Sequence, residues 1–206
     1  MNGTGGEAPA TDIEATRAFF GPRAAGWEDR FPDDVPGYRR AVAELGPPPG
    51  GAVADVACGT GRALPELRAA VGEGGTVLGI DLTAEMLAEA TRLGRRESAV
   101  LVLADAMRLP LATGSLDAVF AAGLLTHLPD PLRGLAELAR VARAGARLAV
   151  FHPIGRAALA ARRGHALRPD DIRAEPHIRS ALASTGWRCD SVDDGPDRYL
   201  ALATRT

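Results

Sequence analysis

Short apolar runs alternate with helical patterns from residue 52 onward. Five of the runs have the length of a strand: Ala52–Ala57, Thr76–Ile80, Ala99–Ala104, Leu116–Ala122 and Arg147–Phe151. Helical patterns lie between several of them, at Ala63–Val71, Ala84–Leu93 and Leu132–Val141. Strands that are apolar on both faces and separated by helices are typical of a parallel sheet covered on both sides.

The end of the chain has a different pattern. A helix is predicted near Pro176–Thr185, followed by strands at Trp187–Val192 and Tyr199–Thr204. Gly195 and Pro196 lie between these strands, so we expect an antiparallel hairpin at the end of the sheet. The sequence therefore predicts an α/β fold: a seven-stranded, mostly parallel sheet with helices on both faces, in which the last strand is antiparallel.

The first 50 residues form a separate region. Residues 1–11 contain too few apolar side chains to pack, and we expect a disordered tail. Residues 12–46 are expected to form a short helical cap or lid, with helices at Asp12–Phe20 and Gly37–Leu45. The proline-rich segment 46–50 is a stiff linker, and the main domain is expected over residues 50–206.

Aromatic residues are concentrated in this N-terminal region. The chain has nine, and five precede residue 40: Phe19, Phe20, Trp27, Phe31 and Tyr38. They predict either a lid with an apolar acceptor pocket or the core of a small helical cap.

Composition and charge narrow the function. The 24 basic side chains are all arginine, and with 26 acidic ones the formal net charge is −2, which disfavours a dedicated nucleic-acid surface. The widely separated Cys58 and Cys189 form neither a disulfide framework nor a zinc cluster. No apolar run approaches the ~20 residues of a membrane span, and no secretion signal is evident. We expect a cytoplasmic protein without a metal centre.

The segment Asp55-Val-Ala-Cys-Gly-Thr-Gly61 carries the clearest chemical signal, because a strand there turns into a helix. Gly59 and Gly61 allow a sharp turn and close approach of a ligand to the backbone. The first-turn N–H groups of the helix favour a negative group. A single Gly-x-Gly turn is also a common structural feature.

Acidic residues at successive strand ends strengthen this signal. Asp81 ends the second predicted strand and Asp105 the third, so both share one rim of the sheet with Asp55. Asp81 is placed to accept both hydroxyls of a ribose. Each residue alone could cap a helix or begin a loop, but three beside a glycine loop indicate a nucleoside site.

The residues around the glycine loop indicate which kind of nucleoside it binds. A dinucleotide fingerprint has a third Gly or Ala where Leu64 stands. A chain without lysine has no phosphate-binding Gly-Lys-Ser/Thr loop. Asp55 favours a ligand with a cationic amine. The pattern therefore favours a nucleoside with an amino-acid tail over a pyrophosphate.

These residues, together with Gly79-Ile-Asp-Leu82, Leu103-Ala-Asp-Ala106 and Leu116-Asp-Ala-Val-Phe120, resemble the successive motifs of class I S-adenosylmethionine-dependent methyltransferases. The similarity is greatest to the small-molecule branch that includes enzymes of ubiquinone and menaquinone biosynthesis, and it covers about residues 50–152. It implies a Rossmann-like fold, S-adenosyl-L-methionine as cofactor, S-adenosyl-L-homocysteine as product, and methyl transfer to an O, N or C atom of a small molecule.

The resemblance also implies a set of cofactor-binding residues. They are Asp55, Ala57, Cys58, Gly59, Thr60, Gly61, Asp81, Leu82, Met86, Asp105, Ala106, Ala121 and Ala122. The loop 57–61 would cradle the methionine portion with Asp55 near its amino group, Asp81 would bind the ribose, and Asp105 the adenine amino group. Ala57 stands where the family often has glycine, and we expect little effect.

His127 is the candidate catalytic residue, because the motif Leu124-Leu-Thr-His-Leu-Pro-Asp130 follows the fourth predicted strand on the same rim. An imidazole with a pKa near neutrality suits a general base, although His127 could instead orient the loop. His152 is a second candidate. The basic run 156–163 could bind an anionic acceptor or form a solvated face.

Other functions remain as alternatives. One is a methyltransferase that acts on nucleic acid or protein. Residues 116–123 lack an Asn/Asp-Pro-Pro-Tyr/Phe motif, which tells against methylation of the amino groups of nucleic-acid bases. A nicotinamide-dependent oxidoreductase is disfavoured by Leu64, and a binding protein without catalysis is the third alternative. We expect a small-molecule acceptor, no nucleic-acid or membrane partner, and a monomer or homodimer.

Overall fold

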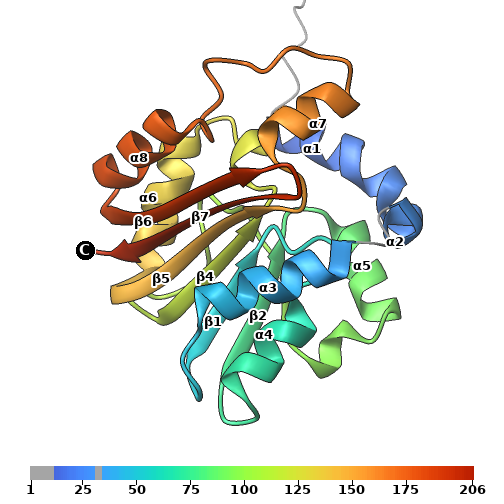
Figure 1. Cartoon of the computed structure of the whole chain (residues 1–206). Helices are drawn as coiled ribbons and strands as arrows, with labels where there is room; N and C mark the ends of the chain where they lie inside the picture. Colours follow the sequence, from blue (N-terminus) through green and yellow to red (C-terminus); the bar gives the residue numbers. More distant parts are fainter. Residues whose placement is uncertain (1–11, 31–33) are drawn as a thin grey trace, which may run out of the picture.

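A seven-stranded sheet forms the centre of the computed structural model, which describes residues 12–30 and 34–206 (Figure 1). The strand order is β3-β2-β1-β4-β5-β7-β6. The strands are β1 (Ala52–Val56), β2 (Thr76–Asp81), β3 (Val100–Leu103), β4 (Leu116–Ala122), β5 (Ala142–His152), β6 (Trp187–Gly195) and β7 (Arg198–Arg205). Strands β1 to β5 are parallel, whereas β7 is antiparallel to both β5 and β6. The predicted mixed sheet and its terminal hairpin are confirmed.

Helices cover both faces of the sheet, because its strands are apolar on both sides. One face packs against α3 (Val35–Leu45) and α4 (Leu64–Val71), through side chains such as Val53 and Phe120. The other face packs against α6 (Pro131–Val141) and α8 (Glu175–Ser184), through side chains such as Ala54 and Val119. Helix α5 (Ala84–Arg92) lies beside β2 and β3. The alternation of neighbouring strand residues between the two cores defines the register of the sheet.

The start of β5 differs from the sequence prediction. We expected this strand to begin at Arg147, but it begins at Ala142, directly after α6. Its residues 143–145 are exposed and include Gly145. The apolar pattern starts only where the strand enters the core, whereas the strand itself begins earlier because its exposed residues keep strand geometry.

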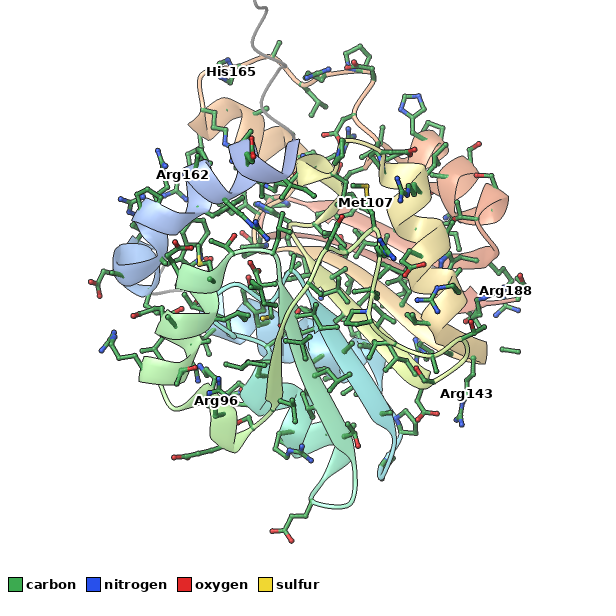
Figure 2. The ribbon with its side chains drawn as sticks, turned by 180° about the vertical axis from the view of Figure 1, so that it is seen from behind. Arg96, Met107, Arg143, Arg162, His165 and Arg188 are labelled. Carbon is green, nitrogen blue, oxygen red and sulfur yellow. The ribbon has the colours of Figure 1, made fainter. Side chains whose placement is uncertain are left out.

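The N-terminal segment runs through α1 (Asp12–Phe20), the 3-10 helix η1 (Gly21–Gly26) and α2 (Trp27–Arg30). Both views show α1 beside α7 (Arg156–Arg162), at the carboxyl edge of the parallel strands (Figures 1 and 2). In Figure 2, Met107 lies at this edge, whereas Arg96 and Arg143 lie toward the opposite one. The expected tail over residues 1–11 lies outside the described residues. In the two described ranges, no helix combines the length and apolarity of a membrane span.

Candidate active site

The loop from Ala57 to Gly61 closes tightly over the end of β1. The N–H groups of Ala57 and Cys58 donate to the carbonyl oxygen of Ile80, at 2.8 and 3.0 Å. Ala57 has φ of +67° and is the one non-glycine residue with a positive φ in the described parts of the chain. A left-handed alanine costs about 1–2 kcal/mol, and such strain is concentrated at functional sites. Ala57 thus adopts a backbone conformation that favours glycine, the residue that the family often has here, and the expectation that alanine has little effect on cofactor binding stays a prediction.

The two glycines of the loop have different roles. A Cβ atom on Gly61, where φ is +82°, would lie 2.7 Å from Cδ1 of Leu64, so close packing excludes a side chain. A Cβ atom on Gly59 would meet nothing nearer than Sδ of Met86, at 4.0 Å. Gly59 therefore faces open space, where its backbone is accessible to a ligand.

Two buried carboxylates support this loop from below. Asp81 accepts hydrogen bonds from the N–H groups of Gly59 and Thr83, each at 2.8 Å. Asp55 is 1% exposed, and its Oδ1 atom has no hydrogen-bond partner among the described residues. Burial raises the pKa of Asp55 well above its usual range, and the nearby charge of Asp81 raises it further. Burial also raises the pKa of Asp81, against the lowering effect of its backbone hydrogen bonds. In the described parts of the chain this pair has no ion-pair partner, and it is suited to a cationic group.

The remaining predicted cofactor residues lie along the same edge. The Asp105 carboxylate follows β3 and accepts from the N–H group of Met107 at 2.9 Å, next to the buried Ala106. Met86 is buried on α5. The carbonyl oxygen of Leu82 accepts from Nε of Arg17 at 3.1 Å, which brings α1 to the expected adenine side.

Two alanines at the end of β4 differ from each other in exposure. Ala121 is fully buried in the core shared with α6 and α8, whereas Ala122 is half-buried on the α3 face. Gly123, which follows them, has φ of +67° and open space where a Cβ atom would stand. The side chain of Ala121 thus packs inside the core, and its backbone is the part that remains for a ligand.

Arg62 is a site residue that the sequence analysis missed. It is 6% exposed, and its guanidinium donates to Glu28 at 3.0 Å and to Asp34 at 3.2 Å. It also donates to the carbonyl oxygens of Trp27 and Glu28, and the Thr60 hydroxyl donates to the Glu28 carboxylate. These contacts bind the N-terminal segment to the glycine loop. Nothing in the sequence distinguishes Arg62 from the other arginines, because its partners are about 30 residues away.

His127 lies in a cavity between α1 and the loop after β4. The cavity measures about 420 Å³. It is lined by Ala15, Thr16, Phe19, Phe20, Thr126, His127, Leu128 and Pro129. The ring of His127 contacts that of Phe20 edge-on, with centroids 5.0 Å apart. His127 is partly accessible to solvent, but the chain around its ring desolvates the imidazole and lowers its pKa. The positive charges of Arg163 and Arg173 lower the pKa further. The imidazole is therefore neutral at pH 7 and able to accept a proton.

The N-terminal aromatic residues do not form one group. Phe19 and Phe20 line the cavity, and Trp27 packs against Phe20 with ring centroids 5.7 Å apart. Tyr38, on α3, instead packs in the core, 5.0 Å from Phe151. Phe31 lies outside the described residues.

His152 is held differently from His127. Its Nδ1 atom lies 3.1 Å from the backbone nitrogen of Ile154, and burial lowers its pKa to about 4. It lines a second, small cavity with Gly123, Thr126 and Arg173. His165 and His177 are exposed.

The fold is that of a class I methyltransferase. It combines the strand order, the glycine loop 57–61, and carboxylates at the ends of β1, β2 and β3. Residues 54–150 match the family model described as a methyltransferase domain. Over these residues the chain is a methyltransferase domain of the class I S-adenosylmethionine-dependent type. At the level of the family, this decides against the nicotinamide-dependent oxidoreductase.

Several relatives carry named activities. A demethylmenaquinone methyltransferase from Beutenbergia cavernae is 40% identical over 114 residues, 55% of this chain and 45% of its own length. One from Mycobacterium sp. strain KMS is 34% identical over 168 residues, 80% of this chain and 64% of its own. An uncharacterized 37.1 kDa protein in transposon TN4556 of Streptomyces fradiae is 42% identical over 106 residues. The chain spans 45% of the Beutenbergia relative, 64% of the Mycobacterium relative and 31% of the Streptomyces relative, less than two thirds of each.

Solved structures share the fold. A SAM-dependent methyltransferase from Aquifex aeolicus is 28% identical with a TM-score of 0.68, covering 82% of this chain and 89% of its own. Magnesium protoporphyrin IX methyltransferase from Synechocystis PCC 6803, with bound SAM, is 20% identical with a TM-score of 0.71. That comparison covers 97% of this chain and all of the other.

The residues present fit the cofactor of this family. The unpartnered Oδ1 atom of Asp55 suits a cationic amino group, and the backbone of Gly59 and Gly123 is free of steric obstruction. A buried carboxylate pair without an ion-pair partner among the described residues, next to an open glycine loop, suits the amino group of an amino-acid tail.

We expect the Asp55→Asn variant to differ from the wild type in the pH dependence of its stability. Since folding raises the pKa of Asp55, the linked stability is fully present below about pH 4, the ordinary pKa. It is lost as the pH rises through the higher pKa of the folded protein. Asparagine does not ionise, so the Tm of the variant minus that of the wild type should increase from pH 5 to pH 8.

Melting curves of the ligand-free proteins measure this difference. The exposed Asp29→Asn variant controls for the removal of one negative charge. A difference that stays constant or shrinks with rising pH would contradict the buried, unpaired state of Asp55.

Proposed function

We propose that this chain catalyses S-adenosylmethionine-dependent methylation of a small-molecule acceptor. The observation that carries the proposal is the buried Asp55 carboxylate, unpartnered at one oxygen beside the open Gly59 of the loop. The names of the relatives support a small-molecule acceptor, since several are demethylmenaquinone methyltransferases. We place the reaction in the cytoplasm, in keeping with free Cys58 and Cys189, with the protein as a monomer or homodimer.

Each cofactor residue has a proposed role. Asp55 receives the amino group, the loop 57–61 surrounds the amino-acid tail, and Asp81 accepts the ribose hydroxyls while continuing to hold Gly59. Asp105 accepts from the adenine amino group, and Leu82 and Met86 provide apolar contact. The cofactor, when bound, supplies a sulfonium methyl group that leaves a neutral thioether. The protein contributes alignment and exclusion of water, which are its main means of accelerating a displacement.

His127 is the proposed general base for acceptors that lose a proton. It lines the 420 Å³ cavity, which is of a size typical for small-molecule sites. Its lowered pKa keeps the imidazole neutral, so that a nitrogen can take a proton from the acceptor. The apolar side chains of Phe19, Phe20 and Leu128 line the cavity with His127 and provide contact area for an apolar acceptor.

We further propose that residues 12–30 act as the lid expected from the sequence. This segment contacts the cofactor edge at two points: Arg17 at Leu82, on the adenine side, and Glu28 at Thr60, on the methionine side. A cofactor held beneath both contacts could leave only when at least one opens. The Arg62–Glu28 ion pair acts as the latch, because Arg62 is nearly inaccessible and both partners are partly shielded from water.

Thermal unfolding with nucleosides tests the proposed function. At a hundredfold excess over its Kd, a ligand stabilises the folded state by about 2.7 kcal/mol, which for a domain of this size is a Tm increase of roughly 5–10 °C. S-Adenosylmethionine and S-adenosylhomocysteine should each give this increase, and NAD should give none. An increase with NAD and none with either sulfur nucleoside would refute the proposal.

His127→Gln should depress kcat while leaving the affinity for S-adenosylhomocysteine unchanged. A positioned general base contributes roughly 10²–10⁴-fold to the rate, and the loss should be measurable once an acceptor is in hand. His152→Gln is the matched comparison, because His152 lies outside the larger cavity. Wild-type turnover by the His127→Gln enzyme would remove His127 from the chemistry.

Glu28→Gln should accelerate release of S-adenosylhomocysteine by weakening the latch. The loss of a partly exposed ion pair of about 1 kcal/mol corresponds to roughly fivefold faster dissociation. Trp27 lies in the lid and Trp187 in the core, so the fluorescence of Trp27 reports opening. Glu66→Gln, which breaks the more exposed pair with Arg39, is the matched control. Equal dissociation rates for both variants would show that the segment is no lid.

A further inference from the structure

The two cavities at the carboxyl edge adjoin, because Thr126 lines both. The larger one is bounded by α1 and the loop after β4, and the smaller one by the ends of β4 and β5. Among the described residues, no acidic side chain lines either cavity. The acidic residues of the site lie instead at the ends of β1, β2 and β3, and they are Asp55, Asp81 and Asp105.

Arginines surround this acid-free region. Arg173 lines the smaller cavity, and its guanidinium is fixed by Asp171, which accepts from Nε at 3.2 Å and from Nη2 at 2.9 Å. Arg163 follows the last turn of α7 and has no carboxylate partner in the described ranges. On the other wall, the guanidinium of Arg23 stacks over the ring of Phe19, 4.1 Å from its centroid.

The positive charge of these arginines affects the pKa of both histidines of the region. Arg163 and Arg173 each lower the pKa of His127 and of His152. Within residues 12–30 and 34–206, no carboxylate shifts the pKa of either ring. The field at the acceptor side of the site is therefore positive, while both imidazoles themselves are neutral at pH 7.

The walls of the larger cavity suit a flat, apolar body. Phe19 and Phe20 meet edge-on with centroids 4.9 Å apart, and Leu128 and Pro129 line the cavity with them. Aromatic faces bind rings through area burial and quadrupole contacts. Helix α7, which carries part of the basic run, lies beside α1, the helix of Phe19 and Phe20, in both views (Figures 1 and 2).

We propose that the methyl acceptor is an aromatic acid, with its ring against Phe19 and Phe20 and its carboxylate facing Arg163 and Arg173. The proposal rests on the proposed function, since the cavity is taken to be the acceptor site. It also assigns a role to part of the basic run 156–163. Of that run, Arg156 is tied to Asp194 at 2.8 Å, whereas Arg163 has a binding function.

The test measures binding of a matched pair of probes to the protein loaded with S-adenosylhomocysteine. Salicylate and salicylamide have the same ring and nearly the same shape, but only salicylate is charged at pH 7. We expect calorimetry to give salicylate about tenfold tighter binding than salicylamide, as for one charge-assisted contact. Arg163→Gln should reduce this preference at least threefold.

Arg162→Gln is the control variant, because Arg162 is the preceding exposed residue on α7 and its loss changes the net charge equally (Figure 2). It should leave the preference unchanged. If salicylamide binds as tightly as salicylate, if neither probe binds, or if both arginine variants act alike, the acceptor proposal is wrong and the proposed function stands. If S-adenosylhomocysteine itself does not bind, the proposed function fails first.

Discussion

The burial of two carboxylates at the ends of neighbouring parallel strands is the constraint on which this site depends. Asp81 shapes the loop by accepting from Gly59, and Asp55 lies beneath it with one oxygen unpartnered. Burying acidic groups without a cation is unfavourable, and it raises the pKa of both. A positive amino group of a ligand would offset this cost, so the buried carboxylates favour binding of a cation. The left-handed backbone of Ala57 also destabilises the folded state at the same loop.

Charge is separated along the carboxyl edge of the sheet. The acidic pair lies at β1 and β2, and the arginines lie around the ends of β4, β5 and α7. β1 and β4 are adjacent in the strand order, so the switch point of the sheet falls between these two regions. Residues 12–30 add two contacts to this edge, from Arg17 to Leu82 and from Glu28 to Thr60. The proposed acceptor site thus combines the aromatic side chains of α1 with the arginines near the ends of β5 and α7.

Much of the fold could be predicted from local patterns. The strands, the terminal hairpin and the glycine loop follow from apolar periodicity and turn chemistry, which act over a few residues. The early start of β5 was missed because its first residues are exposed. Arg62 was missed because its partners, Glu28 and Asp34, come from a segment whose position depends on tertiary packing. Tyr38 was grouped with Phe19 and Phe20 by sequence proximity, yet α3 carries it into the core. Long-range pairing of this kind leaves no periodic signal.

Proton release on cofactor binding tests the central claim most directly. Calorimetric titration with S-adenosylmethionine at pH 6, in buffers of different ionisation enthalpy, measures the number of protons exchanged. The account predicts that binding releases protons, because a cationic amino group ionises the buried carboxylates, and that Asp55→Asn releases fewer. Binding without proton release, or the same release from the Asp55→Asn variant, would contradict it.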